Sequence, residues 1–309
     1  MKHWIKAFRL RTLPLSFSNI LLGSAMAFSF DRSVPISSNF SWTIFALTLL
    51  TTLLLQILSN LANDYGDAKK GADNENRIGP ERAIQSGAIT HKAMLNAIII
   101  VSILALIGGL SLLYLAFKNN LNWTFVGFFL LGIAAIAAAI KYTVGKGAYG
   151  YSGLGDLFVF IFFGWVGVVG TFYLQTHYFD WMLLLPATTM GCFSVAVLNL
   201  NNMRDQVNDK AVGKNTLVVK LGRKNAKIYH ALLFVLAYCI FPLPVLFYSG
   251  EILFLIPFVP VAIIHAIHLV KVYRICDPKD FDPELKKIAL SALLFSILAW
   301  ISIYLDLNI

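Results

Sequence analysis

Amide and carboxyl side chains gather where a long apolar stretch gives way to polar sequence. Asn60, Asp64 and Asp67 follow a run of mostly apolar residues, and Asp73 comes shortly after them. If the run is helical and continues through these residues, their spacing of i, i+4 and i+7 places the first three side chains on one face. The pattern predicts an acidic tip at one end of a helix.

A second cluster of the same kind occurs further along the chain. Asn202, Asp205 and Asp209 have a spacing of i, i+3 and i+7, which again places them on one helical face. The motif that begins at Asn60 recurs at Asn201, 141 residues later, and each copy is followed by another Asp and a Lys/Gly pair. The recurrence indicates two acidic tips of related design.

Clustered carboxylates need a positive partner, because their mutual repulsion is costly near a medium of low dielectric constant. Oxygen ligands from Asp and Asn suit Mg²⁺, which keeps part of its water shell and usually bridges carboxylates to a phosphate. Basic side chains that can bind phosphate oxygens are interleaved with both clusters: Lys69, Lys70, Arg77, Arg82, Arg204 and Lys214. The two segments predict a Mg²⁺–diphosphate site. The alternative is two solvated loops whose charges only mark one side of a membrane.

The segment 141–156 is rich in Gly and Tyr and contains Tyr142, Lys146 and Asp156. Glycine permits a tightly bent backbone close to a ligand, and tyrosine offers a hydroxyl beside an aromatic face. The alternative is a hinge between two helices. His265 and His268 share one face of a later apolar stretch, where we interpret them as polar packing groups and not as a metal site.

The elements that position these residues must be helices in a membrane. Of the 309 residues, 58% are hydrophobic and only 13% are charged, whereas a soluble domain has roughly 25% charged residues. This composition excludes a disordered chain and a water-soluble globule. A net charge of +9 is typical of nucleic-acid-binding proteins, but in a membrane protein the location of the charge matters more than its sum.

Nine stretches are long and apolar enough to cross a bilayer, which takes about 20 residues. They span residues 14–31, 42–63, 93–117, 122–141, 157–176, 181–203, 229–249, 252–271 and 287–305. Three connections between them contain the motifs, at about 64–92, 141–156 and 204–228. The sequence predicts an all-α, polytopic membrane protein with one domain over residues 1–309.

Basic residues are distributed very unequally between the two sides of these spans. With nine spans, 23 of the 25 Lys and Arg residues fall on one side, and Arg32 and Lys118 fall on the other. The positive-inside rule then places the N-terminus and the motif connections in the cytoplasm. Residues 1–27 also resemble a cleavable signal peptide, and such cleavage leaves the orientation of the other spans unchanged.

Both acidic tips follow an even-numbered span, the second and the sixth, so the two copies have the same orientation. We interpret this as two parallel four-helix repeats plus one further helix, with both tips facing one cavity on the cytoplasmic side.

These motifs resemble those of the UbiA-type intramembrane prenyltransferases. The family's Asn/Asp-rich segment after the second helix looks like Asn60 to Asp67 with Asp73 following, and its second segment looks like Asn202 to Lys214. Its Tyr-xxx-Lys element is similar to Tyr142–Lys146. The resemblance covers nearly the whole chain. It implies metal ligands at Asp64, Asp67, Asp73, Asp205 and Asp209, and diphosphate contacts from Asn60, Lys70, Arg82, Asn202, Arg204 and Lys214.

Within this family, residues 63–73, 151–164 and 201–217 look most like the branch that prenylates 1,4-dihydroxy-2-naphthoate in menaquinone synthesis. Two features depart from the family pattern. The gap from Asp67 to Asp73 is longer than in the 4-hydroxybenzoate branch, and Asp156 stands where the naphthoate branch often has Glu. The longer gap implies that Asp73 occupies a different place around the metal than in the 4-hydroxybenzoate branch.

The resemblance implies a Mg²⁺-dependent transferase of the cell inner membrane that takes a polyprenyl diphosphate and an aromatic acceptor. Tyr142, Lys146 and Asp156 are then the candidates to orient or deprotonate the acceptor. Another acceptor such as 4-hydroxybenzoate stays open, as does a secondary transporter of anions, although transport needs a site reached from both faces. We expect no nucleic-acid partner. Prenyl length and oligomeric state do not follow from the sequence.

Overall fold

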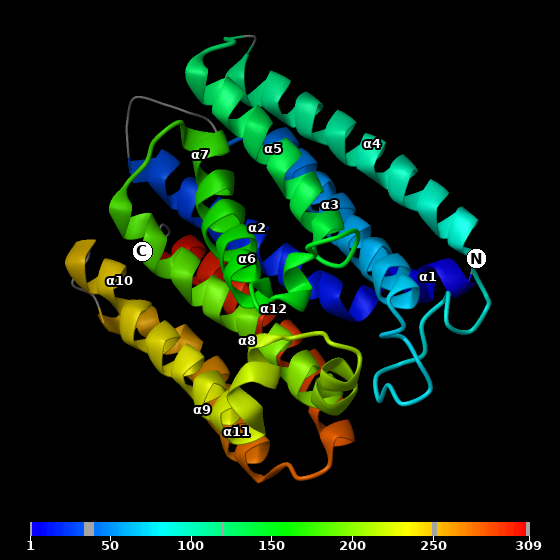
Figure 1. The fold of residues 1–309 in the computed structure, drawn as a ribbon. Coiled ribbons are helices and arrows are strands. Elements are labelled where there is room, and N and C mark those ends of the chain that lie inside the picture. Colours follow the sequence, from blue (N-terminus) through cyan, green and yellow to red (C-terminus); the bar gives the residue numbers. More distant parts are fainter. Residues whose placement is uncertain (1, 34–39, 119, 249–251, 307–309) are drawn as a thin grey trace.

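The computed structural model describes residues 2–33, 40–118, 120–248 and 252–306. Within these residues the secondary structure is helical, and nine segments are long and apolar enough to cross a membrane. Both findings confirm the predicted fold class. Figure 1 shows a bundle in which α4 and α5 lie at one edge, α9 to α11 lie at the other, and α8 runs between them.

Long helices contain most of the described residues. They are α2 (Leu13–Ser33), α3 (Trp42–Lys69), α4 (His91–Phe117), α5 (Trp123–Lys141), α8 (Leu184–Ala211), α9 (Leu217–Ile240), α11 (Val259–Arg274) and α12 (Phe281–Asp306). Shorter helices are α1 (Lys2–Phe8), α6 (Gly155–Val159), α7 (Gly170–Thr176) and α10 (Pro242–Tyr248). Short 3₁₀ turns join them at η1 (Leu10–Thr12), η2 (Tyr149–Tyr151), η4 (Trp181–Leu183), η5 (Ile252–Phe258) and η6 (Pro278–Asp280).

Side-chain caps explain where several helices begin. The side chains of Ser41, Thr90, Asn122 and Thr216 accept hydrogen bonds from backbone N–H groups in the first turns of α3, α4, α5 and α9. Such caps satisfy backbone donors that have no partner inside the helix.

Helix α8 is the centre of the bundle, because it packs against α9, α12 and the π-helical segment η3 (Phe160–Val169). Its buried residues include Met190, Phe193 and Leu200. By contrast, Trp123 is 89% exposed and Leu121 is 72% exposed. Large apolar side chains on the outside of a bundle are expected where lipid replaces water as the solvent.

The predicted span boundaries were wrong by six residues or more at four helix ends. Helix α3 continues to Lys69 and α8 continues to Ala211. Helix α9 begins at Leu217, twelve residues before the predicted start of the seventh span at 229, and α12 begins at Phe281, six residues before the predicted start of the ninth span at 287. The predicted connections at 64–92 and 204–228 are therefore partly helical. A hydropathy window stops at the first charges, whereas a helix with charged side chains can continue into the aqueous phase. The predicted end of the seventh span, residue 249, lies outside the described residues.

The predicted fifth span is also irregular. It is divided into α6, the π-helical η3 and α7. Gly164 of η3 lies so close to α8 that a Cβ atom placed on it would be 2.7 Å from the Ala187 carbonyl oxygen. Glycine is therefore required here for the two helices to approach one another.

Candidate functional site

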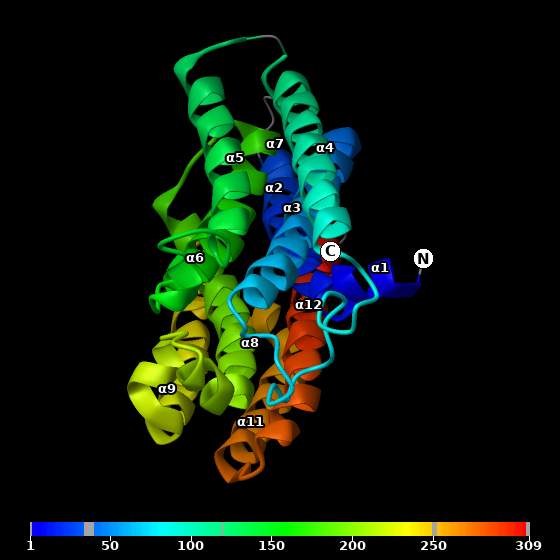
Figure 2. The same cartoon turned by 45° about the vertical axis from the view of Figure 1, so that its right-hand side comes forward.

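A cavity of about 350 Å³ opens inside the bundle between α2, α3, α4, α5, η3, α7 and α8. Polar and charged residues line its end near the motif connections, and apolar residues such as Leu113, Phe128 and Leu174 line its other end. Figure 2 shows α3 and α8 both ending near the loop that precedes α4. The cavity thus connects a charged mouth with a long apolar interior.

The two predicted acidic tips meet at this mouth. The C-terminal ends of α3 and α8 each bring amide and carboxyl side chains to the same cavity, although the two motifs are far apart in the sequence. The predicted site residues that line the cavity are Asn60, Asp67, Asp73, Arg82, Tyr142, Asn202, Asp205, Asp209 and Lys214. The expectation that both tips face one cavity is confirmed.

Asp67 is held by groups from two other segments. The Tyr151 hydroxyl donates a hydrogen bond to its Oδ1 at 2.8 Å, and Lys214 Nζ lies 3.3 Å from its Oδ2. Burial lowers the pKa of Lys214, but the carboxylates of Asp67 and Asp209 outweigh this and raise it overall. Lys214 is therefore a permanent cation at the mouth and can bind an anion there.

Asp73 lies in the loop between α3 and α4, which folds back over the mouth. Its Oδ1 is 3.3 Å from Arg77 Nε and 3.5 Å from Arg82 Nε. Burial raises the pKa of Asp73 despite these two guanidinium groups. Burial and the neighbouring Arg82 lower the pKa of Arg77 to about 10, so its guanidinium is still charged at neutral pH.

The loop is fixed to both helices that carry the acidic tips. The Asn208 amide on α8 donates to the Ala72 carbonyl at 2.8 Å, and the Ala83 N–H donates to Asp64 Oδ2 on α3 at 3.2 Å. Gly79 leaves room for the guanidinium groups, since a Cβ there would be 2.5 Å from Nη2 of Arg77 and of Arg204. The loop therefore delivers its arginines to a defined position above the cavity.

Asp205 is the most strongly paired acid of the second tip. Arg204 Nε donates to its Oδ1 at 3.0 Å, and Arg204 Nη2 donates to its Oδ2 at 2.7 Å. Arg77 Nη2 lies 3.5 Å from the same Oδ2. This bidentate contact holds the Asp205 carboxylate in one orientation at the cavity wall.

The acidic residues offer the carboxylate oxygens that can bind Mg²⁺, although several of these carboxylates are paired with Lys or Arg side chains in this structure. In the described part of the chain, no three His, Cys, Asp or Glu side chains converge as a ready metal site. However, Asp64 Oδ1 and both carboxylate oxygens of Asp73 are buried without a hydrogen-bond partner. Carboxylate oxygens are ligands that Mg²⁺ prefers, and buried acceptors are costly when they lack a hydrogen bond.

Five predicted site residues lie away from the cavity wall. The residues that do not line the cavity are Asp64, Lys70, Lys146, Asp156 and Arg204. Asp64 and Arg204 are buried directly behind the wall, where they contact the loop and Asp205. Lys146 is exposed to the outside, and Asp156 is buried in the first turn of α6, where it contacts Tyr229. Lys70 lies over the Tyr151 ring, with its Nζ 3.9 Å from the ring centroid.

The segment 141–156 contributes tyrosines to the site, whereas its predicted residue Lys146 lies outside the cavity. Tyr142 lines the cavity, and burial together with the nearby Asp156 raises the pKa of its hydroxyl above the ordinary value. Tyr142 is therefore a neutral hydroxyl that can donate a hydrogen bond. Tyr151, which we did not single out from the sequence, contacts Asp67 directly. Aromatic residues are frequent throughout this chain, so no local signal separates Tyr151 from the others.

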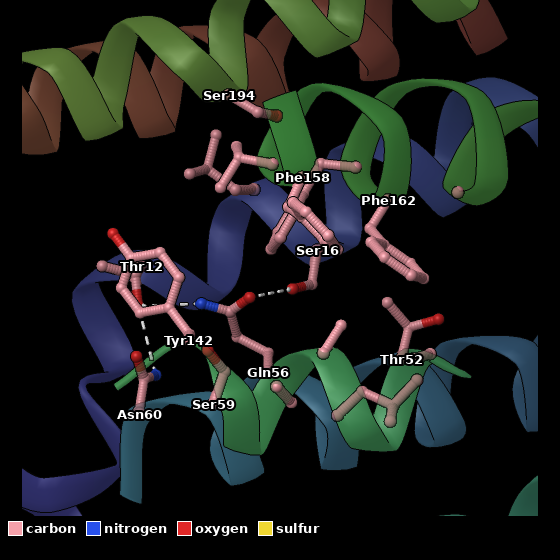
Figure 3. A pocket seen from close by; sticks show the side chains of 18 of the residues that line it. Thr12, Ser16, Thr52, Gln56, Ser59, Asn60, Tyr142, Phe158, Phe162 and Ser194 are labelled. Atoms are coloured by element: carbon pink, nitrogen blue, oxygen red, sulfur yellow. Dashed lines mark hydrogen bonds between the residues drawn. The ribbon is translucent and has the colours of Figure 1, made fainter. Parts of the chain in front are cut away.

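Three further polar residues below the mouth, Thr12, Ser16 and Gln56, were not predicted from the sequence. The Ser16 hydroxyl on α2 donates to Gln56 Oε1 on α3 at 3.2 Å, and the amides of Gln56 and Asn60 lie 3.5 Å from Thr12 Oγ1. Figure 3 shows these residues facing Phe158 and Phe162, which project from the opposite wall. These residues are spread singly over η1, α2 and α3, and only the packing of these elements brings them together.

Comparisons with known proteins agree with this geometry. The sequence model of the UbiA prenyltransferase family matches residues 33–302. The chain is 44% identical to the 1,4-dihydroxy-2-naphthoate octaprenyltransferase of Escherichia coli (strain K12), over 98% of this chain and 95% of that one. It is 42% identical to the protein of the same name from Haemophilus influenzae, over 96% and 94% of the two chains.

Among solved structures, the fold is similar to that of a UbiA homolog from Archaeoglobus fulgidus bound to GPP and Mg²⁺. The TM-score is 0.58 with 16% identity, and the match covers 96% of this chain and 99% of that one. At this identity the likeness concerns the fold alone.

Proposed function

The chain belongs to the UbiA prenyltransferase family, and from this membership we propose that it prenylates 1,4-dihydroxy-2-naphthoate. The reaction transfers a polyprenyl group from its diphosphate, releases CO₂ and diphosphate, and yields demethylmenaquinone in its quinol form, because no oxidant takes part. The observation that carries this proposal is the similarity of nearly the whole chain to relatives named for this acceptor. The cavity supports it, because its charged mouth and apolar interior suit a substrate with an anionic head and an apolar tail.

The diphosphate head belongs at the charged mouth. Lys214, Arg77 and Arg82 surround the acidic residues and can bind diphosphate oxygens through charge-assisted hydrogen bonds. Asp67, Asp73, Asp205 and Asp209 would hold Mg²⁺ from the two opposing tips, with Asp64 behind them. When bound, Mg²⁺ would neutralise charge on the leaving diphosphate. The Archaeoglobus fulgidus homolog was solved with GPP and Mg²⁺ bound, which supports a role for Mg²⁺ in this fold without identifying its ligands here.

The prenyl tail belongs in the apolar interior, among residues such as Leu113, Phe128 and Phe162. Ionisation of the allylic C–O bond leaves a delocalised carbocation and diphosphate. Water would quench this cation, so the apolar walls protect it. The electron-rich naphthoate ring attacks the cation at the carbon that bears the carboxylate, and loss of CO₂ from that carbon restores aromaticity.

The acceptor ring then lies next to Tyr142, between the mouth and the apolar interior. As a neutral donor facing the cavity, Tyr142 can orient the acceptor by a hydrogen bond. Asp156 contacts Tyr229 from behind the wall and acts on the acceptor only through neighbouring groups. Because Lys146 is exposed outside the cavity, this arrangement assigns it no contact with the substrates.

The test is to supply the purified protein with Mg²⁺ and a prenyl diphosphate, and with 1,4-dihydroxy-2-naphthoate or 4-hydroxybenzoate as the acceptor. We expect diphosphate and CO₂ in equal amounts with the naphthoate, and little turnover with the benzoate. Diphosphate release with 4-hydroxybenzoate and without CO₂ would assign the protein to the other acceptor. Absence of diphosphate with either acceptor would contradict prenyl transfer altogether.

The protein is a multi-pass membrane protein, since nine helices of its described part can cross a bilayer. We further place it in the cell inner membrane with the mouth of the cavity facing the cytoplasm. The unequal distribution of Lys and Arg supports this orientation.

A further inference from the structure

Asp282, in the first turn of α12, lies outside both acidic motifs but is connected to the second one. It accepts a hydrogen bond from Arg204 Nη1 through Oδ1. It also accepts from Arg11 Nη1 at 3.2 Å through Oδ1 and at 2.9 Å through Oδ2. Asp282 therefore joins the segment before α2 to the arginine that holds Asp205.

The Arg204 side chain is fully buried, and its donors are divided between two carboxylates. Nε and Nη2 point at Asp205, Nη1 points at Asp282, and Nη2 also donates to Asn201 Oδ1 at 2.6 Å. A guanidinium in this position cannot rotate without losing several charge-assisted hydrogen bonds. Asp282 thus fixes the group that in turn fixes the plane of the Asp205 carboxylate.

The local charge balance indicates what Asp282 contributes. Arg77, Arg204 and Arg11 meet here with the carboxylates of Asp205 and Asp282. If Asp282 were neutral, Arg204 would direct its charge at the Asp205 carboxylate alone. A carboxylate whose negative charge is neutralised by nearby guanidinium groups attracts a divalent cation only weakly. By sharing the charge of Arg204, Asp282 leaves negative charge on Asp205.

We infer that Asp282 is a positioning residue for the acidic site: through Arg204 it orients Asp205 and keeps it able to bind a divalent cation with a prenyl diphosphate. Asp205 and Arg11 line the cavity, whereas Asp282 does not. Asp282 therefore acts on the site through its neighbours. The inference rests on the proposed function, because it assumes that the mouth binds Mg²⁺ and a diphosphate.

The experiment measures Mg²⁺-dependent binding without turnover. Purified protein is titrated with Mg²⁺ in the presence of geranyl S-thiolodiphosphate, a prenyl diphosphate analogue that resists ionisation, and the rise in Tm is recorded. We expect Asp282→Asn to raise the half-saturating Mg²⁺ concentration by about tenfold or more, as loss of an outer partner of a metal ligand commonly does. Asp282→Glu should fall between this variant and the original protein.

The matched control is Asp280→Asn, which removes an exposed carboxylate two residues earlier in the chain and should leave the Mg²⁺ midpoint unchanged. The KM for the aromatic acceptor should also be unchanged in Asp282→Asn, whereas general loosening of the bundle would raise it. A folded Asp282→Asn protein with the original Mg²⁺ midpoint would overturn the inference.

A charge-balanced pair of variants decides the matter if Asp282→Asn does not fold. Arg11→Gln together with Asp282→Asn removes one charge of each sign, and it is compared with Arg11→Gln alone. We expect the double variant to need about tenfold more Mg²⁺ than the single variant, and equal midpoints would overturn the inference. If the analogue with Mg²⁺ does not stabilise even the original protein, the proposed function fails, and this outcome differs from both of the others.

Discussion

At the scale of single residues, the site depends on how each carboxylate is partnered. Asp67 contacts a tyrosine and a lysine, Asp73 contacts two arginines, and Asp205 is held by Arg204. These contacts let several acids share a small volume without prohibitive repulsion. In the proposed function the same cations also bind the diphosphate, so these charges would serve both the folded protein and its substrate.

Replacement of Asp67 tests this assignment most directly. Asp67→Ala should lower kcat/KM for the prenyl diphosphate by about 10²-fold or more. It removes a carboxylate that would hold Mg²⁺ against the negative charge that develops on the leaving diphosphate. Prenyl transfer is measured at saturating acceptor. Glu81→Gln changes an exposed carboxylate in the loop over the mouth and should leave the rate within about twofold. Equal rates for both variants and the original protein would show that Asp67 does not participate.

At the scale of the elements, the position of α8 relative to its neighbours determines the site, because α8 carries the second acidic tip. Gly164 permits the close approach of η3 on one side. On the other side a buried polar network joins α8, α9, α11 and α12. It runs from Asn199 through His230 and His268 to Glu284, with ring and side-chain atoms 2.5 to 3.2 Å apart. The interpretation of His268 as a polar packing group agrees with these contacts.

The glycine contact predicts a clear difference between two Gly→Ala variants. Gly164→Ala should destabilise the protein by about 1–3 kcal/mol, because its Cβ would overlap the Ala187 carbonyl of α8. Gly132→Ala on α5 places its Cβ where no atom lies within 4 Å, and should be neutral or stabilising by up to about 1 kcal/mol. Tm in detergent reports the difference, and similar Tm values for the two variants would contradict the packing argument.

The polar network also predicts that replacing its buried acid destabilises the protein more than replacing an exposed partner of that acid. Glu284 is fully buried and accepts from His268, while Lys271, its partner at 2.8 Å, has a side chain that is 52% exposed. Glu284→Leu should cost about 3–5 kcal/mol, because it leaves buried polar groups unpaired, whereas Lys271→Gln should cost less than about 1 kcal/mol. Thermal unfolding measures both. A small loss for Glu284→Leu would mean that the network contributes little to packing.

At the scale of the whole molecule, the charge distribution predicts the orientation in the membrane. Cys276, in the connection between α11 and α12, is exposed, and it lies on the side that carries most of the Lys and Arg residues. A membrane-impermeant maleimide should therefore label the protein in inverted vesicles and fail to label it in right-side-out vesicles. Cys276→Ser should abolish the label, since Cys192 is buried, and Cys239, although exposed, lies within the apolar span Leu217–Phe247, where a water-soluble maleimide does not reach. Labelling in right-side-out vesicles alone would reverse the proposed topology.

The sequence alone determined the class of protein, the nine spans and the two acidic tips. Hydropathy and helical spacing are local properties, and they do not depend on how the helices pack. For this reason the spacing of Asn60, Asp67, Asp205 and Asp209 is enough to place these residues on helix faces. The ends of α3, α8 and α9 could not be placed in this way, because charged residues that leave the bilayer can remain helical.

Only the tertiary structure decided which residues share the cavity. It brought Tyr151, Gln56 and Thr12 to the site, left Lys146 outside it, and joined Asp282 to Arg204 across 78 residues of sequence. Such contacts depend on the relative position of helices, which is set by close approaches such as that at Gly164. A pattern of residue types along one helix contains no information about the side chains that face it from another helix.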